Sequence, residues 1–268
     1  MHPDLISLGF LHVKTYGAFM ALGFLAAWQV IAYLCRRTGR NPESLSNLLM
    51  LMMGSGVLGA RLAYVIEHWE AEFARNPALV VRVDQGGLMF YGGLILAIAV
   101  FVIWCRAKQE GLVRMADLFA TVIPLGHAFG RVGCFFYGCC YGRLSDCACA
   151  VSFPRGSPAW YEQVNAGKLA SDAASALPVL PTQLFEAASV LGLFGVLFLV
   201  YRRFWDRLPG LVTGCYFVGY ACIRFGIEVL RGDPRAEVGP FSISQTISLG
   251  LLLAGGAFIM VAFRRGKL

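Results

Sequence analysis

The sequence predicts an all-α membrane protein, a bundle of seven transmembrane helices with a small periplasmic head. Of its 268 residues, 57% are hydrophobic and 15% are charged, whereas soluble domains carry about 25% charged residues. Apolar runs of about 20 residues, the length that crosses a bilayer, recur along the chain. The net charge of +7 comes from short basic clusters between these runs. That placement is typical of membrane proteins, so we expect no nucleic-acid partner.

Seven apolar runs are long enough to cross a membrane. They are predicted at about 16–34, 47–66, 87–105, 115–133, 183–201, 211–229 and 242–263. We do not expect the first to be a cleaved signal peptide, because six more spans follow and no small-x-small cleavage site is visible. The long, proline-punctuated segment 134–182 is predicted to form the head. The whole chain, 1–268, is therefore expected to be one integral-membrane domain.

The loop charges predict the orientation. Basic clusters follow the first, third, fifth and seventh runs, at Arg36, Arg37 and Arg40, at Arg106, Lys108 and Arg114, at Arg202, Arg203 and Arg207, and at Arg264, Arg265 and Lys267. Clusters of this kind stay on the cytoplasmic side. We therefore expect an N-terminus outside, a C-terminus inside and the head on the outer face.

Polar residues of the predicted spans gather near their outer ends. They include Tyr16, Arg61, Tyr64, Tyr91, His127, Arg131, Gln183, Glu186, Arg224, Glu228, Arg231 and Gln245. The inner halves of the spans are almost entirely apolar, whereas a transporter is expected to carry polar groups near the midplane as well. The pattern therefore indicates chemistry at the outer leaflet.

Three arginines are the strongest sign of a ligand. The polar residues include Arg61, Arg131 and Arg224. A guanidinium group can donate hydrogen bonds to two phosphate oxygens at once. Each alone could instead reach the headgroups, or pair internally with Glu186 or Glu228. Three arginines at one depth beside glycine-rich segments favour a site for an anionic lipid.

Two pairs of polar residues are spaced four apart on predicted helices. His127 and Arg131 therefore share one helix face, where the histidine could accept a proton or simply be hydrogen-bonded within the bundle. Arg224 and Glu228 could form a structural ion pair, or Glu228 could orient Arg224 toward a phosphate.

Five of the nine cysteines lie close together, at Cys134, Cys139, Cys140, Cys147 and Cys149. Their spacing, C-x4-C-C-x6-C-x-C, is not a standard metal-ligand pattern. The outer face is oxidising, so we expect a disulfide before free thiols, and free thiols before a metal. No metal site and no cofactor are predicted, and the pairing stays open.

Several motifs together resemble one family. GRVGCFFYGCCYGR, GARLAYVIE, GLMFYGGLIL, PTQLFEA, IRFGIEVLRGDP and SISQ occur in the order found in the prolipoprotein diacylglyceryl transferases. The resemblance covers about 16–250. The Gly-Arg-x-Gly stretch and the Arg-Phe-x-x-Glu-x-x-Arg stretch are its most specific parts.

The resemblance implies a multi-pass enzyme of the bacterial inner membrane. Such enzymes transfer diacylglyceryl from phosphatidylglycerol, a membrane lipid, to the thiol of the lipobox cysteine in a prolipoprotein signal peptide. A thioether forms and glycerol phosphate is released. It implies that Arg131 and Arg224 bind the lipid phosphate. It also implies a substrate cavity lined or supported by Tyr16, Arg61, Tyr64, Gly92, Gly93, Gly133, Gly142, Gln183, Glu186, Glu228, Arg231 and Gln245.

The chain departs from the family pattern at three positions. Tyr91 stands where well-known members have a histidine thought important for catalysis, Cys134 where many have asparagine, and Cys139 where many have an acidic residue. We hypothesise that His127 replaces the missing base, with Tyr91 as the other candidate. If neither does, the chain is a divergent paralogue that binds phosphatidylglycerol but modifies another acceptor, or a non-catalytic lipid binder.

Overall fold

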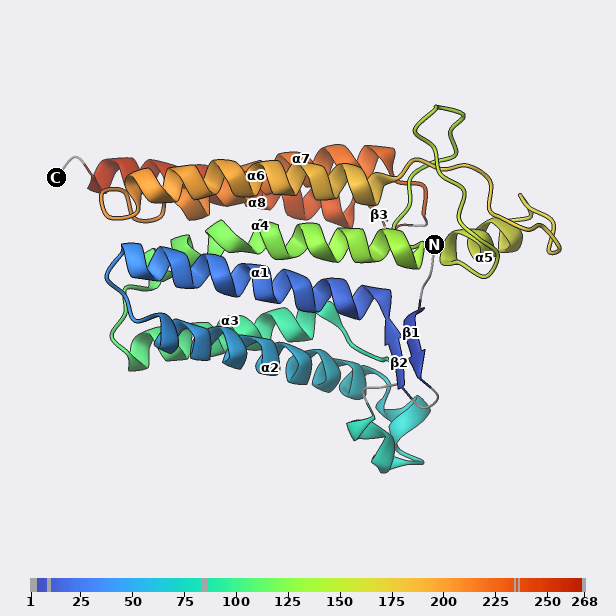
Figure 1. Cartoon of the computed structure of the whole chain (residues 1–268), viewed down its shortest axis with the longest axis horizontal. Coiled ribbons are helices and arrows are strands. Elements are labelled where there is room, and N and C mark those ends of the chain that lie inside the picture. Colours follow the sequence, from blue (N-terminus) through green and yellow to red (C-terminus); the bar gives the residue numbers. More distant parts are fainter. Residues whose placement is uncertain (1–3, 9–10, 83–85, 234, 236, 267–268) are drawn as a thin grey trace. The chain divides into compact units, whose positions relative to one another are not determined.

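The computed structural model is helical with two small hairpins, and it describes residues 4–8, 11–82, 86–233, 235 and 237–266 (Figure 1). Lys267 of the last basic cluster lies outside these ranges. In chain order the elements are β1 (Asp4–Leu8), β2 (Leu11–Lys14), α1 (Thr15–Arg37), α2 (Pro42–Glu67), η1 (Trp69–Phe73), η2 (Pro77–Val81), α3 (Phe90–Ala107), α4 (Leu112–Tyr137), α5 (Pro158–Asn165), α6 (Thr182–Phe204), α7 (Leu211–Leu230), β3 (Glu237–Val238), β4 (Phe241–Ser242) and α8 (Ile243–Arg265). β1 pairs antiparallel with β2, and β3 with β4.

Six helices are long and apolar enough to cross a membrane, namely α1, α2, α3, α4, α6 and α8. This confirms the predicted multi-pass helical protein. The sixth predicted span, 211–229, corresponds to α7, which has 20 residues, contains Arg224 and Glu228 and is not among these helices. Its crossing of the membrane stays a prediction.

Two helices extend beyond their predicted bounds for local reasons. α2 begins at Pro42, because the side chain of Asn41 accepts a hydrogen bond from the Glu43 N–H and proline suits the first helical position. α4 continues to Tyr137, so residues 134–137, assigned from the sequence to the head, belong to this helix.

The chain forms two compact units. Unit 1 comprises Met1–Val30 and Ala116–Leu268, and unit 2 comprises Ile31–Met115. In unit 2, α2 and α3 lie side by side (Figure 1) and cross at glycines. A Cβ atom on Gly59 would lie 2.5 Å from the Gly92 oxygen, and one on Gly93 would lie 2.6 Å from the Gly56 oxygen. Gly92 and Gly93 therefore allow close helix packing.

In unit 1, α6, α7 and α8 lie side by side (Figure 1). The start of α7 is fixed by Asp117, a buried residue of α4. Its Oδ2 accepts a hydrogen bond from the Gly210 N–H at 2.6 Å, and its Oδ1 accepts from the N–H and hydroxyl of Thr213 at 2.8 and 2.7 Å. A carboxylate is favoured at a helix N-terminus, where backbone N–H groups lack partners.

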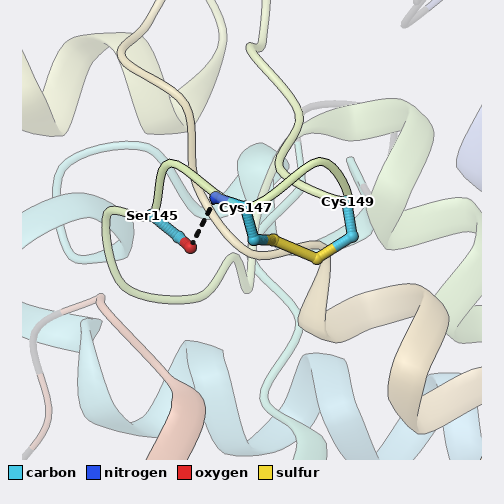
Figure 2. Close-up of a disulfide and its surroundings, with 3 residues drawn as sticks. All are labelled: Ser145, Cys147 and Cys149. Atoms are coloured by element: carbon cyan, nitrogen blue, oxygen red, sulfur yellow. Dashed lines mark hydrogen bonds between the residues drawn. A yellow bond between two sulfur atoms is a disulfide. The ribbon is translucent and has the colours of Figure 1, made fainter.

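The segment predicted to form the head follows α4 and contains α5, which is capped by Ser157. Its core consists of Tyr141, Phe153, Ala159, Trp160, Ala176 and Val179. Cys147 and Cys149 form a disulfide, and the Cys147 N–H donates a hydrogen bond to the Ser145 hydroxyl at 3.2 Å (Figure 2). The expected disulfide is thereby confirmed for this one pair.

Candidate active site

Glu186 lies at the centre of a charged cluster in unit 1. Its side chain is only 1% exposed, in the second turn of α6. Its Oε1 lies 3.3 Å from His127 Nε2, while its Oε2 lies 3.0 Å from Arg131 Nε and 3.7 Å from Arg224 Nη1. The predicted helix face that carries His127 and Arg131 therefore meets α6 and α7 at this carboxylate. Cations around a buried carboxylate compensate for its lost hydration.

Arg224 is held on two sides through one nitrogen of its guanidinium group, while another nitrogen makes no hydrogen bond among the described residues. Its Nη2 lies 2.7 Å from Glu228 Oε2, so the two residues do pair within α7, as their spacing allows. The same Nη2 donates a hydrogen bond to the Ser244 hydroxyl of α8 at 2.9 Å. Its Nη1 is buried and has no hydrogen-bond partner among the described residues. A buried donor without a partner is costly, so this atom points to a ligand.

His127 and Arg131 share a hydrogen bond that depends on the position of one proton. Arg131 Nε donates to His127 Nε2 at 3.0 Å, which requires an unprotonated Nε2. The same Nε2 lies 3.3 Å from Glu186, a contact that is favourable when Nε2 carries a proton. His127 Nε2 is therefore placed where it could accept a proton, and the positive charge that results would face the Glu186 carboxylate. The Nη atoms of Arg131 make no hydrogen bond within the described part of the chain.

A tight loop after α4 brings three cysteines together. Cys134 is in the last turn of α4, and its carbonyl accepts hydrogen bonds from the N–H groups of Gly138 and Cys139 at 2.9 and 3.3 Å. Gly138 and Cys140 both have positive φ angles, 83° and 62°, which turn the chain back on itself. The sulfur atoms of Cys134, Cys139 and Cys140 lie within 4.8 Å of one another.

The start of α6 fastens this loop. Gln183 is fully buried, and its Nε2 donates to the Cys139 carbonyl at 2.7 Å. The Thr182 hydroxyl donates to the Cys140 carbonyl at 2.9 Å. Gln183, expected to line the substrate cavity, thus has a positioning contact with the cysteine loop.

Two glycines of the predicted site allow close backbone approach. A Cβ atom on Gly133 would lie 3.0 Å from the Tyr16 ring and 3.3 Å from its Cα, so the first turn of α1 packs directly on α4. A Cβ atom on Gly142 would lie 2.8 Å from the Leu230 oxygen at the end of α7. Gly133 therefore places Tyr16, which is 42% exposed, at the end of α4 that carries Arg131.

Comparison with known proteins identifies the family. The prolipoprotein diacylglyceryl transferase family matches residues 3–261. The chain is 33% identical to the phosphatidylglycerol--prolipoprotein diacylglyceryl transferase of Rhodospirillum rubrum, over 99% of this chain and 93% of that protein. It is 31% identical to the protein of the same name from Pseudoalteromonas translucida, over 98% and 93% of the two chains. The chain belongs to the prolipoprotein diacylglyceryl transferase family.

In this family member, Arg61 of unit 2 has its donors engaged by backbone. Its Nε donates to the Val80 carbonyl, its Nη1 to the Gly86 and Gly87 carbonyls, and its Nη2 to the Leu79 carbonyl, at 2.6–3.0 Å. The guanidinium also lies over the Tyr64 and Phe73 rings. Arg61 thus anchors the segment between α2 and α3, unlike Arg131 and Arg224. Its predicted role at the lipid stays untested.

Four other predicted site residues have partners or positions that can be described. The Tyr64 hydroxyl donates to Glu72 at 3.0 Å. Tyr91, at the start of α3 in unit 2, is 57% exposed. Arg231 makes a two-point ion pair with Asp233, at 2.8 and 2.7 Å. The Gln245 side chain accepts from the Ser242 N–H in a capping box at the start of α8. Their roles toward a substrate stay predictions.

Sequence reasoning missed three polar residues of unit 1. The Tyr220 ring lies 5.5 Å from the His127 ring, and its position four residues before Arg224 on α7 was the available signal. Asp233 follows Arg231 by two residues and forms an ion pair with it. The sequence did not reveal the local chain path that brings these two side chains together. Asp117 lay in an apolar span, where an acidic residue is itself unusual.

Proposed function

We propose that the chain transfers diacylglyceryl from phosphatidylglycerol to the thiol of the lipobox cysteine in a prolipoprotein, at the outer leaflet of the inner membrane. A thioether forms and glycerol phosphate leaves. The observation that carries this proposal is the buried Arg224 Nη1. It makes no hydrogen bond among the described residues, lies 3.7 Å from Glu186 Oε2, and is beside the Nη atoms of Arg131, which also make no hydrogen bond there. These donors suit a phosphate oxygen, and the family membership supplies the reaction.

The two arginines act on the leaving group. In the reaction the carbon–oxygen bond between the diacylglyceryl group and the phosphate breaks, and negative charge grows on the phosphate. Arg131 and Arg224 are held in advance by Glu186 and Glu228, at 3.0 and 2.7 Å. Donors fixed before the reaction stabilise developing charge more effectively than mobile ones.

His127 acts on the acceptor. The thiol must lose its proton before the sulfur can attack carbon, because the thiolate is the nucleophile. In the proposed step, His127 Nε2 takes that proton, and the sulfur–carbon bond forms as the carbon–oxygen bond breaks. Glu186 Oε1, 3.3 Å from Nε2, stabilises the imidazolium that results. The histidine thereby replaces the one that Tyr91 displaces in the family pattern.

The proposal includes a membrane arrangement. α7 also crosses the membrane, which makes seven spans. The N-terminus and the head lie on the periplasmic face, and the C-terminus lies in the cytoplasm. One supporting observation is that basic residues lie in the last turns of α1, α3, α6 and α8. Another is that the charged site lies toward the first turns of α6, away from the basic end of that helix, and toward the last turns of α4 and α7. The partners are phosphatidylglycerol and a signal peptide with a lipobox.

Complementation tests the function. The chain is expressed in a bacterium depleted of its own diacylglyceryl transferase, and lipidated prolipoprotein is followed by gel shift. We expect rescue by the wild type and none by Arg131→Ala or His127→Ala. The control is Arg106→Ala, in the last turn of α3, which should rescue. Membrane levels are checked by immunoblot. No rescue by a wild-type protein that reaches the membrane would favour a divergent paralogue with another acceptor or a lipid-binding factor.

A rescue by His127→Ala equal to that of the wild type would remove His127 from the mechanism while keeping the function. Tyr91→Phe is then the next variant. Loss of activity in that variant alone would assign the proton transfer to the tyrosine.

A further inference from the structure

The three sulfur atoms of Cys134, Cys139 and Cys140 form a cluster that the proposed reaction does not use. All three residues are partly buried and carry free thiols, and their sulfur atoms lie within 4.8 Å of one another. The cysteines come from the last turn of α4 and from the loop that follows it. Side chains this close, on a backbone this constrained, resemble a ligand set.

The backbone holds the cluster independently of any bond between sulfurs. The positive φ angles of Gly138 and Cys140 fold the loop onto the helix end, and Gln183 and Thr182 bind the Cys139 and Cys140 carbonyls. At Gly138, moreover, an added Cβ would lie 3.1 Å from Phe153 and from Ser157 of the head. The loop therefore cannot easily open to separate the thiols.

We propose that Cys134, Cys139 and Cys140 bind one thiophilic cation, Zn²⁺ or Cu⁺, through three thiolates. Zinc–sulfur bonds of about 2.3 Å put the sulfurs of a tetrahedral site about 3.8 Å apart. The sulfur atoms lie within 4.8 Å of one another, so binding requires the side chains to rotate toward the ion. Zinc would take a fourth ligand, such as water, whereas Cu⁺ is satisfied by soft thiolates alone.

The surrounding charges suit such a site. Three thiolates with Zn²⁺ carry a net charge of −1, and with Cu⁺ a net charge of −2. Arg131 and Arg231 are close enough to Cys140 to act on it electrostatically. Their positive charges offset the excess negative charge of the loaded site. Binding releases one proton from each thiol and involves no oxidation.

A disulfide is the competing use of these thiols. Cys139 and Cys140 are neighbours, and adjacent Cα atoms are about 3.8 Å apart, below the range of about 4.4–6.8 Å that disulfides favour. A bond from Cys134 to either one would leave the third sulfur beside it unused. A cation uses all three sulfurs, and it ties the end of α4 to the loop that leads into the head.

Thiol protection in the wild-type protein tests the proposal without any substitution. The purified protein in detergent is stripped with a chelator and treated with an alkylating reagent, with and without one equivalent of ZnCl₂. Seven cysteines are free among the described residues. We expect zinc to slow alkylation of Cys134, Cys139 and Cys140 together, located by peptide mass spectrometry, and to leave Cys215 and Cys222 unchanged.

Metal content and spectra distinguish the two cations. Elemental analysis of the purified protein should find about one zinc or copper per chain. Cobalt in place of zinc should give a sulfur-to-metal charge-transfer band. Cys134→Ser, Cys139→Ser and Cys140→Ser should each lose that band, whereas Cys215→Ser and Cys222→Ser should keep it. Gel filtration shows whether each variant is folded.

Two results would overturn the proposal. One is alkylation of the three thiols at the same rate with and without Zn²⁺ and with and without Cu⁺. The other is a disulfide between any two of them in the non-reduced wild-type protein. Neither result depends on transferase activity, so the metal site and the proposed function are judged separately.

Discussion

Glu186 organises the candidate site at the scale of single residues. A carboxylate 1% exposed in an apolar helix bundle is unfavourable by itself. Here three cationic or protonatable side chains, from α4 and α7, surround it. In the proposed reaction, the same contacts hold Arg131 and Arg224 in place for a phosphate. We therefore expect stability and catalysis to depend on the same residue.

Replacing Glu186 by glutamine should affect both properties. The change leaves His127, Arg131 and Arg224 without their common carboxylate, and loss of one partner from a buried ion pair costs about 3–5 kcal/mol. We expect a lower unfolding temperature in detergent and a loss of transferase activity of at least about 100-fold. Glu70→Gln, at an exposed residue, is the control. Full activity in Glu186→Gln would show that this carboxylate does not position the arginines.

Arg224→Lys separates charge from geometry. Lysine keeps a positive charge for Glu228, but it lacks the planar fork that reaches Glu228, Ser244 and a ligand at once. We predict that unfolding temperature changes little while transferase activity falls about 100-fold or more. The control is Arg202→Lys, in the last turn of α6 and far along that helix from Glu186. It should leave the unfolding temperature and the transferase activity unchanged. Equal activity in wild type and Arg224→Lys would contradict two-point binding of phosphate.

The residues of the site were predictable where spacing on a helix fixed them. His127 with Arg131, and Arg224 with Glu228, are four apart, so a shared face followed from helix geometry. The contacts of Arg61 with four carbonyls of the segment 79–87 were not predictable, because they depend on a loop path. The sequence shows that five cysteines lie close together, but not that the sulfur atoms of Cys134, Cys139 and Cys140 meet, because that depends on the positive φ angle of Cys140.

At the scale of elements, the crossing of α2 and α3 depends on glycine. A Cβ atom at Gly59 would lie 2.5 Å from the Gly92 oxygen and 2.7 Å from Leu96. Gly59→Ala should therefore destabilise the protein by about 1–3 kcal/mol, the usual cost of overpacking. Gly54→Ala, on the same helix with nothing within 4 Å, should be neutral or slightly stabilising. Thermal unfolding in detergent compares the two, and equal unfolding temperatures would contradict the close crossing.

The N-terminus of α7 depends on Asp117. Asp117→Asn keeps the shape of the side chain but removes one acceptor oxygen from the three hydrogen bonds to Gly210 and Thr213. We expect a loss of about 1–3 kcal/mol in stability, measured by thermal unfolding. Asp172→Asn, exposed in the head, is the matched control. Because α7 carries Arg224, Asp117→Asn should also lower activity, and an unchanged unfolding temperature would rule out this capping role.

The helices themselves were predictable from apolar length, whereas the start of α2 and the end of α4 were not. Six of the predicted spans have the length and composition to cross a membrane. α4 continues four residues past the predicted end, through Cys134, because it stops only at Gly138, the first residue that takes a positive φ. Hydropathy cannot detect such an end, since Phe135, Phe136 and Tyr137 are as apolar as the span before them.

At the scale of the whole molecule, the predicted orientation places the site on the outer face. The basic residues Arg36, Arg37, Arg202, Arg203, Arg264 and Arg265 end three of the helices. Fusion of alkaline phosphatase after Ala166 in the head should give an active enzyme in the periplasm, and a fusion after Arg265 should not. Fluorescent-protein fusions at the same positions should show the reverse. The opposite pattern would invert the proposed topology and place the site in the cytoplasm.

One assay of the purified protein shows whether the charged cluster around Glu186 catalyses the transfer. The purified protein in lipid nanodiscs containing phosphatidylglycerol is mixed with a lipobox peptide, and glycerol phosphate release is measured with the mass of the peptide. We predict release and a peptide heavier by one diacylglyceryl group for the wild type, and neither for Arg131→Ala. A folded wild-type protein that binds phosphatidylglycerol without releasing glycerol phosphate would contradict the account.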